Sequence, residues 1–213
     1  MYITAGVNPN SHYSLVAVDG NLYVTDNKEI NIKTEVITPP DYMKGEIILG
    51  GKDITVYCNT YTDRLRLQLI SGCANACKFC NAKEFKYEFN EIKYLEEALL
   101  IGLSQSDVRH VLISSGSAHT RDLGKITEMY EYFGRKYSHL DLDIMLTPRG
   151  FTGYNNVDEY ESYLRHLKEI GISGLSVNME LNNKEYLTRF CPEKAAIGQE
   201  NYLKFIVLAV CIF

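Results

Sequence analysis

Short runs of apolar residues near the start of the chain predict β-strands. Leu15–Val18 and Leu22–Thr25 are separated by Asp19-Gly20-Asn21. Asp-Gly readily adopts the positive φ angles of a tight turn, so this pattern predicts a β-hairpin. A second pair of runs surrounds a Gly-Gly turn, in the segments Glu46–Leu49, Gly50-Gly51 and Ile54–Tyr57. We therefore expect residues 1–63 to form a small β-rich extension.

From residue 64 onward, strand-like and helix-like patterns alternate. The strand-like runs are Leu65–Ile70, Val111–Ile113, Leu142–Leu146 and Ile172–Val177. Apolar residues at helical spacing follow each of them, in segments that begin near Asn90, Leu123, Asn156 and Gln199. Asn90 is a candidate helix cap, and Asn156 with Glu159 three positions on is arranged like a capping box. Four strand–helix repeats predict parallel strands joined by right-handed helical crossovers.

This repeat predicts the α/β class and a partial (βα) TIM-like barrel over residues 64–213, with about four βα units. Active sites in such barrels lie in the loops that follow the carboxyl ends of the strands. The segments of interest therefore come after Ile70, Ile113, Leu146 and Val177.

Composition and charge restrict the possible functions. The chain has 213 residues with 46% hydrophobic and 23% charged positions, as expected for a globular protein. Its net charge of −5 gives no general attraction to nucleic acid. The longest apolar run, Phe205–Phe213, is shorter than the roughly 20 residues of a membrane span. The first ten residues lack the features of a signal peptide, so we expect a cytoplasmic protein whose six cysteines bind metal or pack.

Three of the cysteines form a C-x3-C-x2-C motif directly after the first strand of the repeat. They are Cys73, Cys77 and Cys80. Structural zinc and fully protein-bound four-iron clusters normally take four protein ligands, whereas three thiolates leave one coordination position open. A zinc site completed by Cys58 or by a histidine, or an electron-transfer iron–sulfur site, is the alternative. The motif therefore predicts a metal centre. The sequence alone leaves two kinds of centre open: a three-cysteine site with a free coordination position, and a zinc or electron-transfer iron–sulfur site without one.

The motif and its position resemble the radical S-adenosylmethionine (SAM) superfamily, in which an aromatic residue often precedes the third cysteine, as Phe79 does here. The resemblance implies a [4Fe–4S] cluster bound by Cys73, Cys77 and Cys80, with SAM on the fourth iron. It further implies reductive cleavage of SAM to a 5′-deoxyadenosyl radical that abstracts hydrogen from a substrate. An external electron donor such as flavodoxin or ferredoxin would then be a partner, and we expect no nucleic-acid or membrane partner.

Two further segments resemble SAM-contacting positions of the family. Ser114, Ser115, Gly116 and Ser117 stand where the family has a Gly-Gly-Glu-type segment, although no glutamate is present here. Asn178 and Glu180 resemble the Asn-x-Glu segment of the branch with biotin synthase, lipoyl synthase and the hydrogenase-maturation enzymes. Residues i and i+2 of a strand face the same side, so both side chains could meet one ligand. An ordinary Gly/Ser turn and surface polar residues are the respective alternatives.

Arg189 could pair with the carboxylate of SAM through its forked donors, or it could be a solvated surface residue. The family barrel has roughly six βα units, and only four are apparent here. We therefore expect the core to be C-terminally truncated, or completed by a partner, and an inactive truncated fragment is a further alternative. The substrate and the reaction type cannot be read from the sequence.

Overall fold

The computed structural model describes residues 10–26, 31–34, 38–61, 63–148 and 157–213, without the side chains of residues 157 and 158. The chain divides into two compact units, Met1–Pro39 and Pro40–Phe213. This boundary lies earlier than the one we expected at residue 63. The reason is that Tyr42, Ile54 and Cys58 are buried in the core of the second unit.

The first unit is a three-stranded antiparallel sheet in the order β1-β2-β3. Its strands are β1 (Ser14–Val18), β2 (Asn21–Thr25) and β3 (Asn31–Thr34). Asp19 and Gly20, which connect β1 to β2, have φ angles of 49° and 77°. Positive φ at both central residues matches the right-handed twist of the flanking strands, so the predicted hairpin is confirmed.

The second unit is a mixed α/β structure around a five-stranded sheet in the order β12-β11-β10-β7-β6. Its strands are β6 (Cys58–Thr60), β7 (Leu65–Leu67), β10 (His110–Ile113), β11 (Asp141–Leu146) and β12 (Gly174–Val177). The four strands from β7 to β12 pair in parallel, and β6 pairs antiparallel with β7. Parallel strands need long crossover connections, and the helices supply them.

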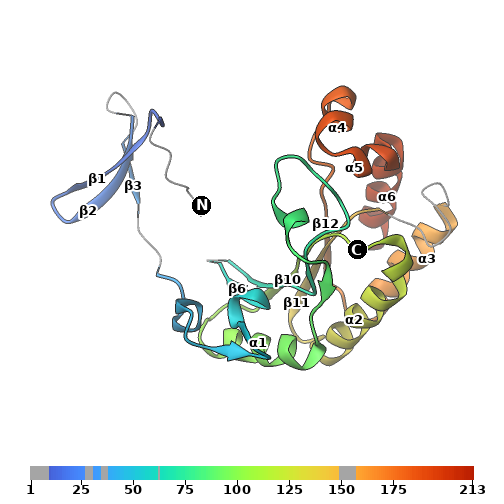
Figure 1. Ribbon diagram of the computed structural model, residues 1–213, viewed down its shortest axis with the longest axis horizontal. Coiled ribbons are helices and arrows are strands. Elements are labelled where there is room, and N and C mark those ends of the chain that lie inside the picture. The colour runs from blue at the N-terminus through green and yellow to red at the C-terminus, as the bar shows by residue number, and fades with distance from the viewer. Residues whose placement is uncertain (1–9, 27–30, 35–37, 62, 149–156) are drawn as a thin grey trace. The chain divides into compact units, whose positions relative to one another are not determined.

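Three helices lie along one face of this sheet (Figure 1): α1 (Ile92–Ser104), α2 (Leu123–Lys136) and α3 (Val157–Glu169). Alternate side chains of the strands point toward them and are almost fully buried: Leu65, Leu67, Val111, Ile113, Leu142 and Ile144. The other face of the sheet carries more polar residues, including Arg66 and Asp143. The helices therefore leave this second face open for a site.

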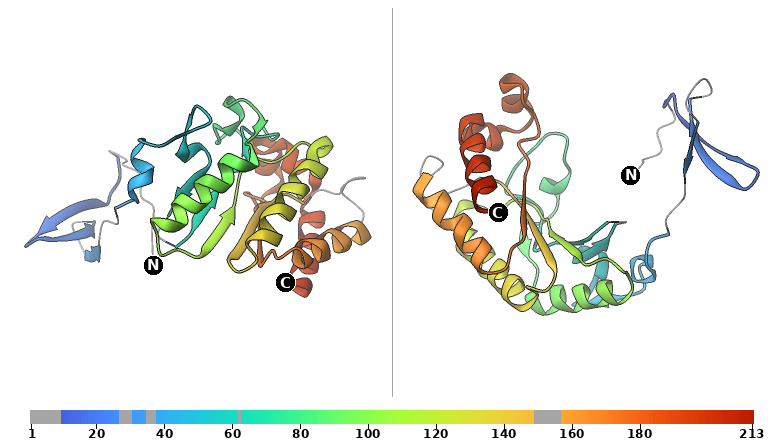
Figure 2. Two further views of the ribbon diagram at one scale, coloured as in Figure 1. Left: turned by 90° about the horizontal axis from the view of Figure 1, so that it is seen from below. Right: turned by 180° about the vertical axis from the view of Figure 1, so that it is seen from behind.

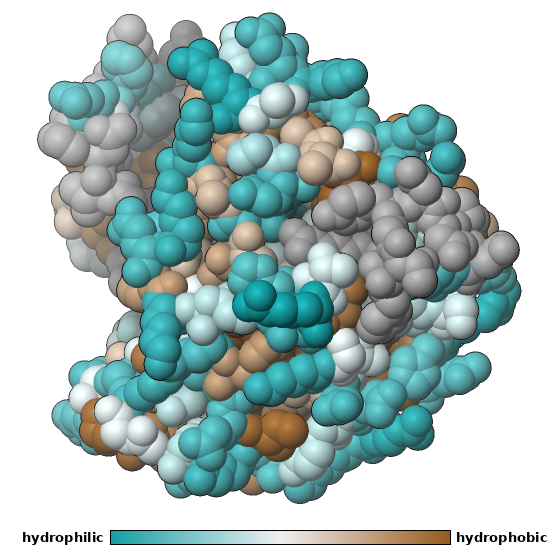
Figure 3. All heavy atoms as spheres, turned by 45° about the vertical axis from the view of Figure 1, so that its right-hand side comes forward, coloured by the Kyte–Doolittle hydropathy of each residue, from teal (hydrophilic) through white to brown (hydrophobic). Residues whose placement is uncertain are grey.

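The helices after β12 are α4 (Lys184–Phe190), α5 (Pro192–Ile197) and α6 (Gln199–Ile212). Helix α6 packs against α3, with the rings of Tyr160 and Phe205 5.1 Å apart in an edge-to-face arrangement. Figure 2 shows α4, α5 and α6 together beyond the end of the sheet. On the face drawn in Figure 3, hydrophilic side chains surround small apolar groups. None of the helices in the described ranges is long and apolar enough to cross a membrane.

Two local predictions were wrong, each for an identifiable reason. Ile54–Val56 forms a 3-10 helix rather than a strand, because Oδ1 of Asp53 accepts the backbone N–H of Thr55 at 2.8 Å and caps that turn. A short hairpin of β4 (Ile48–Leu49) and β5 (Lys52–Asp53) precedes it. Asn90 does not cap α1, since its Nδ2 donates instead to the carbonyl of Gln68 at 2.8 Å. Asn156, expected to begin the third helix, lies outside the described residues.

Candidate functional site

A pocket of about 530 Å³ lies beyond the carboxyl ends of the parallel strands. Most of the residues that we singled out from the sequence line it: Cys73, Cys77, Phe79, Cys80, Ser115, Gly116, Ser117, Asn178 and Glu180. These residues come from three separate segments of the chain. The end of a parallel sheet is where the topology brings such segments together.

The three cysteines lie on the loop that connects the two strands of a short antiparallel ribbon. Strand β8 (Ile70–Ser71) pairs antiparallel with β9 (Glu88–Phe89), and the loop between them contains the 3-10 helix Ala82–Glu84. Because β8 and β9 are paired, they hold the two ends of the loop together, and all three cysteines belong to this one loop. Phe79 also belongs to this loop, and 61% of its surface is exposed.

Backbone N–H groups point at two of the three sulfur atoms. Sγ of Cys73 accepts from the backbone N–H groups of Asn75 and Ser117, at 3.3 and 3.2 Å. Sγ of Cys80 accepts from the N–H of Ala82 at 3.4 Å. Hydrogen bonds to sulfur of this kind adjust the potential of an iron–sulfur centre. The donor set therefore fits a thiolate-bound metal centre.

Cys77 contacts a thiol that sequence reasoning missed. It is buried in a small cluster with Cys191 and Leu187, and Cys191 is completely inaccessible to solvent. Burial, together with the neighbouring Cys191 thiol, raises the pKa of Cys77 to about 12. No sequence signal could have found this pair, because Cys191 lies far along the chain and has no cysteine at metal-ligand spacing. Cys58 does not reach the pocket: it is buried against Tyr42, with 3.7 Å between Sγ and the hydroxyl.

The three cysteines do not yet surround a common point. Within the described residues, no group of three Cys, His, Asp or Glu side chains is arranged to hold a metal ion. Binding a cluster would therefore require their side chains to turn toward one another within the loop.

Helices α4 and α5 hold the cysteine loop from the other side. The N–H of Lys78 donates to the carbonyl of Phe190 at 2.8 Å, and the N–H of Ala76 donates to Oε2 of Glu193 at 3.0 Å. Helix α4 is itself capped, since Oδ1 of Asn183 accepts from the N–H of Tyr186 at 3.0 Å. The segment that carries Cys191 thus fixes the middle of the cysteine motif.

Changing Glu193 to alanine should loosen the loop without removing a thiol. The lost hydrogen bond has a charged acceptor but is exposed, so we expect about 1 kcal/mol of loop stabilisation to be lost. If the loop binds a metal ion, a chelator should then remove that ion roughly fivefold faster from E193A, measured by the absorbance of the released complex. Glu200→Ala, at an exposed pair with Lys204, is the matched control and should leave the rate unchanged. Equal rates for E193A and E200A would show that Glu193 does not hold the loop.

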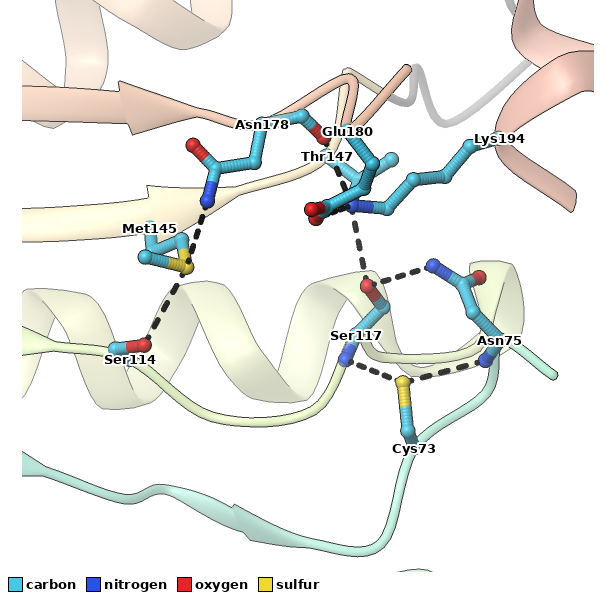
Figure 4. Close-up of polar contacts among 9 residues, drawn as sticks. All are labelled: Cys73, Asn75, Ser114, Ser117, Met145, Thr147, Asn178, Glu180 and Lys194. Atoms are coloured by element: carbon cyan, nitrogen blue, oxygen red, sulfur yellow. Dashed lines mark hydrogen bonds and ion pairs between the residues drawn. The ribbon is translucent and has the colours of Figure 1, made fainter. Parts of the chain in front are cut away.

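Lys194 joins the two predicted polar residues after β12 (Figure 4). Its Nζ donates to the carbonyl of Asn178 at 2.8 Å and to Oε1 of Glu180 at 2.6 Å. The Lys194 side chain is only 9% exposed, so its charge is neutralised inside the site. Glu180 has a φ of 78°, which is uncommon for a residue with a side chain and clusters at functional sites. The structure does not bring Arg189 to the pocket, because α4 presents its guanidinium to solvent and to the ring of Phe190 at 5.3 Å.

The Ser-rich segment after β10 lies directly against the cysteine loop. Oγ of Ser117 lies 3.0 Å from Nδ2 of Asn75 and 3.2 Å from Oγ1 of Thr147 (Figure 4). The N–H of Ala74 donates to the carbonyl of Ser117 at 2.9 Å. Ser114 is fully buried and does not line the pocket; its Oγ contacts Sδ of Met145 at 3.4 Å. The segment therefore supports Cys73 through main-chain and hydroxyl contacts.

Comparison with known proteins identified no relative of this chain. The chain matches no protein-family model, and it matches none of the curated proteins.

Proposed function

We propose that this chain is a radical SAM protein that binds a [4Fe–4S] cluster and SAM, with the sheet forming part of a partial (βα) barrel. The observation that carries the proposal is the position of the C-x3-C-x2-C loop. All three cysteines line one pocket at the carboxyl ends of four parallel strands. The pocket volume of about 530 Å³ is within the range of small-molecule sites.

When bound, the cluster and SAM would supply a 5′-deoxyadenosyl radical, with the electron coming from an external donor such as flavodoxin or ferredoxin. Cys73, Cys77 and Cys80 would hold the iron. Ser115, Gly116 and Ser117 offer main-chain and hydroxyl groups beside Cys73. Asn178 and Glu180 offer polar side chains across the pocket, oriented by Lys194. A reducing, cytoplasmic location would keep these thiols available.

A metal site without catalysis is the second candidate, and one observation favours it. Cys191 is buried against Cys77, so four thiols lie near the loop, as many as a closed zinc or electron-transfer iron–sulfur site uses. In that case Cys191 is a ligand. In the radical SAM proposal it is a packing neighbour and one iron stays open.

Metal analysis separates these candidates at the first step. The full chain is reconstituted anaerobically with iron and sulfide, or offered zinc, and the bound metal is measured by elemental analysis. The proposal predicts about four iron and four sulfide ions per chain. Stable binding of one zinc ion, with no retained iron and sulfide, would contradict it and support the closed site.

A further inference from the structure

The face of the sheet opposite the helices carries a row of side chains below the cysteine loop. Pairing between the strands sets Arg66 of β7 beside Leu112 of β10, and Leu112 beside Asp143 of β11. Ser114 and Met145 lie two residues further along their strands, nearer the cysteines. Arg66 lines the same pocket as Cys73. Of this row, Arg66 and Met145 line the pocket and form part of its floor.

Arg66 is held in place but leaves most of its donors unused. Its Nε donates to the carbonyl of Ser114 at 3.2 Å, which orients the guanidinium toward the cysteine end of the strands. In the part of the chain that the structure describes, Arg66 makes no ion pair, and its two terminal nitrogens have no hydrogen-bond partner. A half-buried guanidinium with free paired donors is suited to a carboxylate or a phosphate.

The other charges near Arg66 are already paired. Glu180 and Lys194, which also line the pocket, form an ion pair with each other. Asp143 lies in the same row, but its Oδ2 is 2.6 Å from Nε2 of His110. Its other oxygen leans over Gly174, where an added Cβ would come within 2.3 Å of it. Among the described residues that line the pocket, Arg66 is thus the cation without a counter-charge.

We propose that Arg66 binds an anionic group of the substrate, a carboxylate or a phosphate, on the floor of the pocket. This inference rests on the proposed function, because it assigns a substrate class to the same pocket. A substrate anchored at Arg66 would place its remaining atoms in the pocket that Cys73 also lines. The positive charge of Arg66 would favour substrates that carry an anionic group. The distance between that group and the rest of the substrate would determine which substrate atom lies beside the cysteine loop.

Binding of simple anions to the metal-free full chain tests this inference. Butyrate and inorganic phosphate are titrated separately while the side-chain Nε–Hε signal of Arg66 is followed by NMR; its assignment comes from its loss in R66Q. We expect this signal to shift with saturation for at least one probe, and the probe that binds identifies the anionic group. A signal that does not respond to either probe would overturn the inference.

Matched variants make the test specific. Arg64, two residues earlier on the same chain segment, is paired with Asp63 and does not line the pocket. R64Q should bind the probes as the unchanged chain does, whereas R66Q should bind at least about tenfold more weakly and R66K at an intermediate level. Equal binding by R66Q and R64Q would overturn the inference. Because the assay needs no iron, a failure to load iron would refute the proposed function and leave this result intact.

Discussion

Iron and sulfide content should fall to background when Cys73, Cys77 or Cys80 is changed to alanine. In the proposed site each thiolate would supply one of three protein bonds to the cluster, and two thiolates would not hold it. Even indirect changes around a metal commonly cost 10- to 100-fold in affinity, so loss of a ligand should cost at least about tenfold. The measurement is iron and sulfide per chain after anaerobic reconstitution and desalting.

Two other cysteines give this experiment its controls. Cys211 is exposed on α6 and does not line the pocket, so Cys211→Ala should load iron normally. Cys191→Ala distinguishes the two candidate sites, because it removes a packing neighbour in one and a ligand in the other. We expect C191A to retain most of its iron. Loss of iron in C191A as complete as in C77A would contradict an open three-cysteine site.

Gly116→Ala should displace the cysteine loop although it changes no ligand. An added Cβ at this position would lie 1.8 Å from the carbonyl oxygen of Gly72 and 2.8 Å from Cα of Cys73. Both neighbours are main-chain atoms, so relief requires the loop or the Ser-rich segment to move. Overpacking of this kind typically costs 1–3 kcal/mol or more, and here we expect about 3 kcal/mol in the free energy of unfolding. Urea denaturation and iron content should both report the change.

Gly124 in α2 provides the opposite case. An added Cβ there meets nothing within 4 Å, and its φ is not in the left-handed region. Gly124→Ala should therefore leave iron loading unchanged and stabilise the helix by up to about 1 kcal/mol. If G116A and G124A had the same stability and the same iron content, the close approach of the two loops would not matter to the site.

The order of strands and helices could be predicted because each depends on a local pattern. Alternating residues such as Leu65 and Leu67 mark a strand with one buried face, and Asp19-Gly20 marks a turn by its φ angles. The errors arose where a side chain competed for a backbone group. Asp53 caps a 3-10 turn in place of the expected strand, and Asn90 binds the carbonyl of Gln68 rather than capping α1.

The candidate site could be predicted only in part, for a related reason. Spacing identified Cys73, Cys77 and Cys80, and strand order placed them beside Ser115 and Asn178. It could not predict that Cys191 contacts Cys77 or that Lys194 pairs with Glu180, because these contacts join positions that are distant in the sequence. Arg66 was also missed. Alternation along a strand shows that its side chain faces away from the helices, but it does not show that the nearby charged residues are paired with one another and leave Arg66 without a counter-charge.

The most direct test of the account is electron paramagnetic resonance of the reconstituted, reduced chain with and without SAM. The radical SAM proposal predicts a [4Fe–4S] signal whose g-values shift when SAM is added, because an iron without a protein ligand is open to it. The C77A chain should give no such signal. A signal that is identical with and without SAM would contradict the proposal.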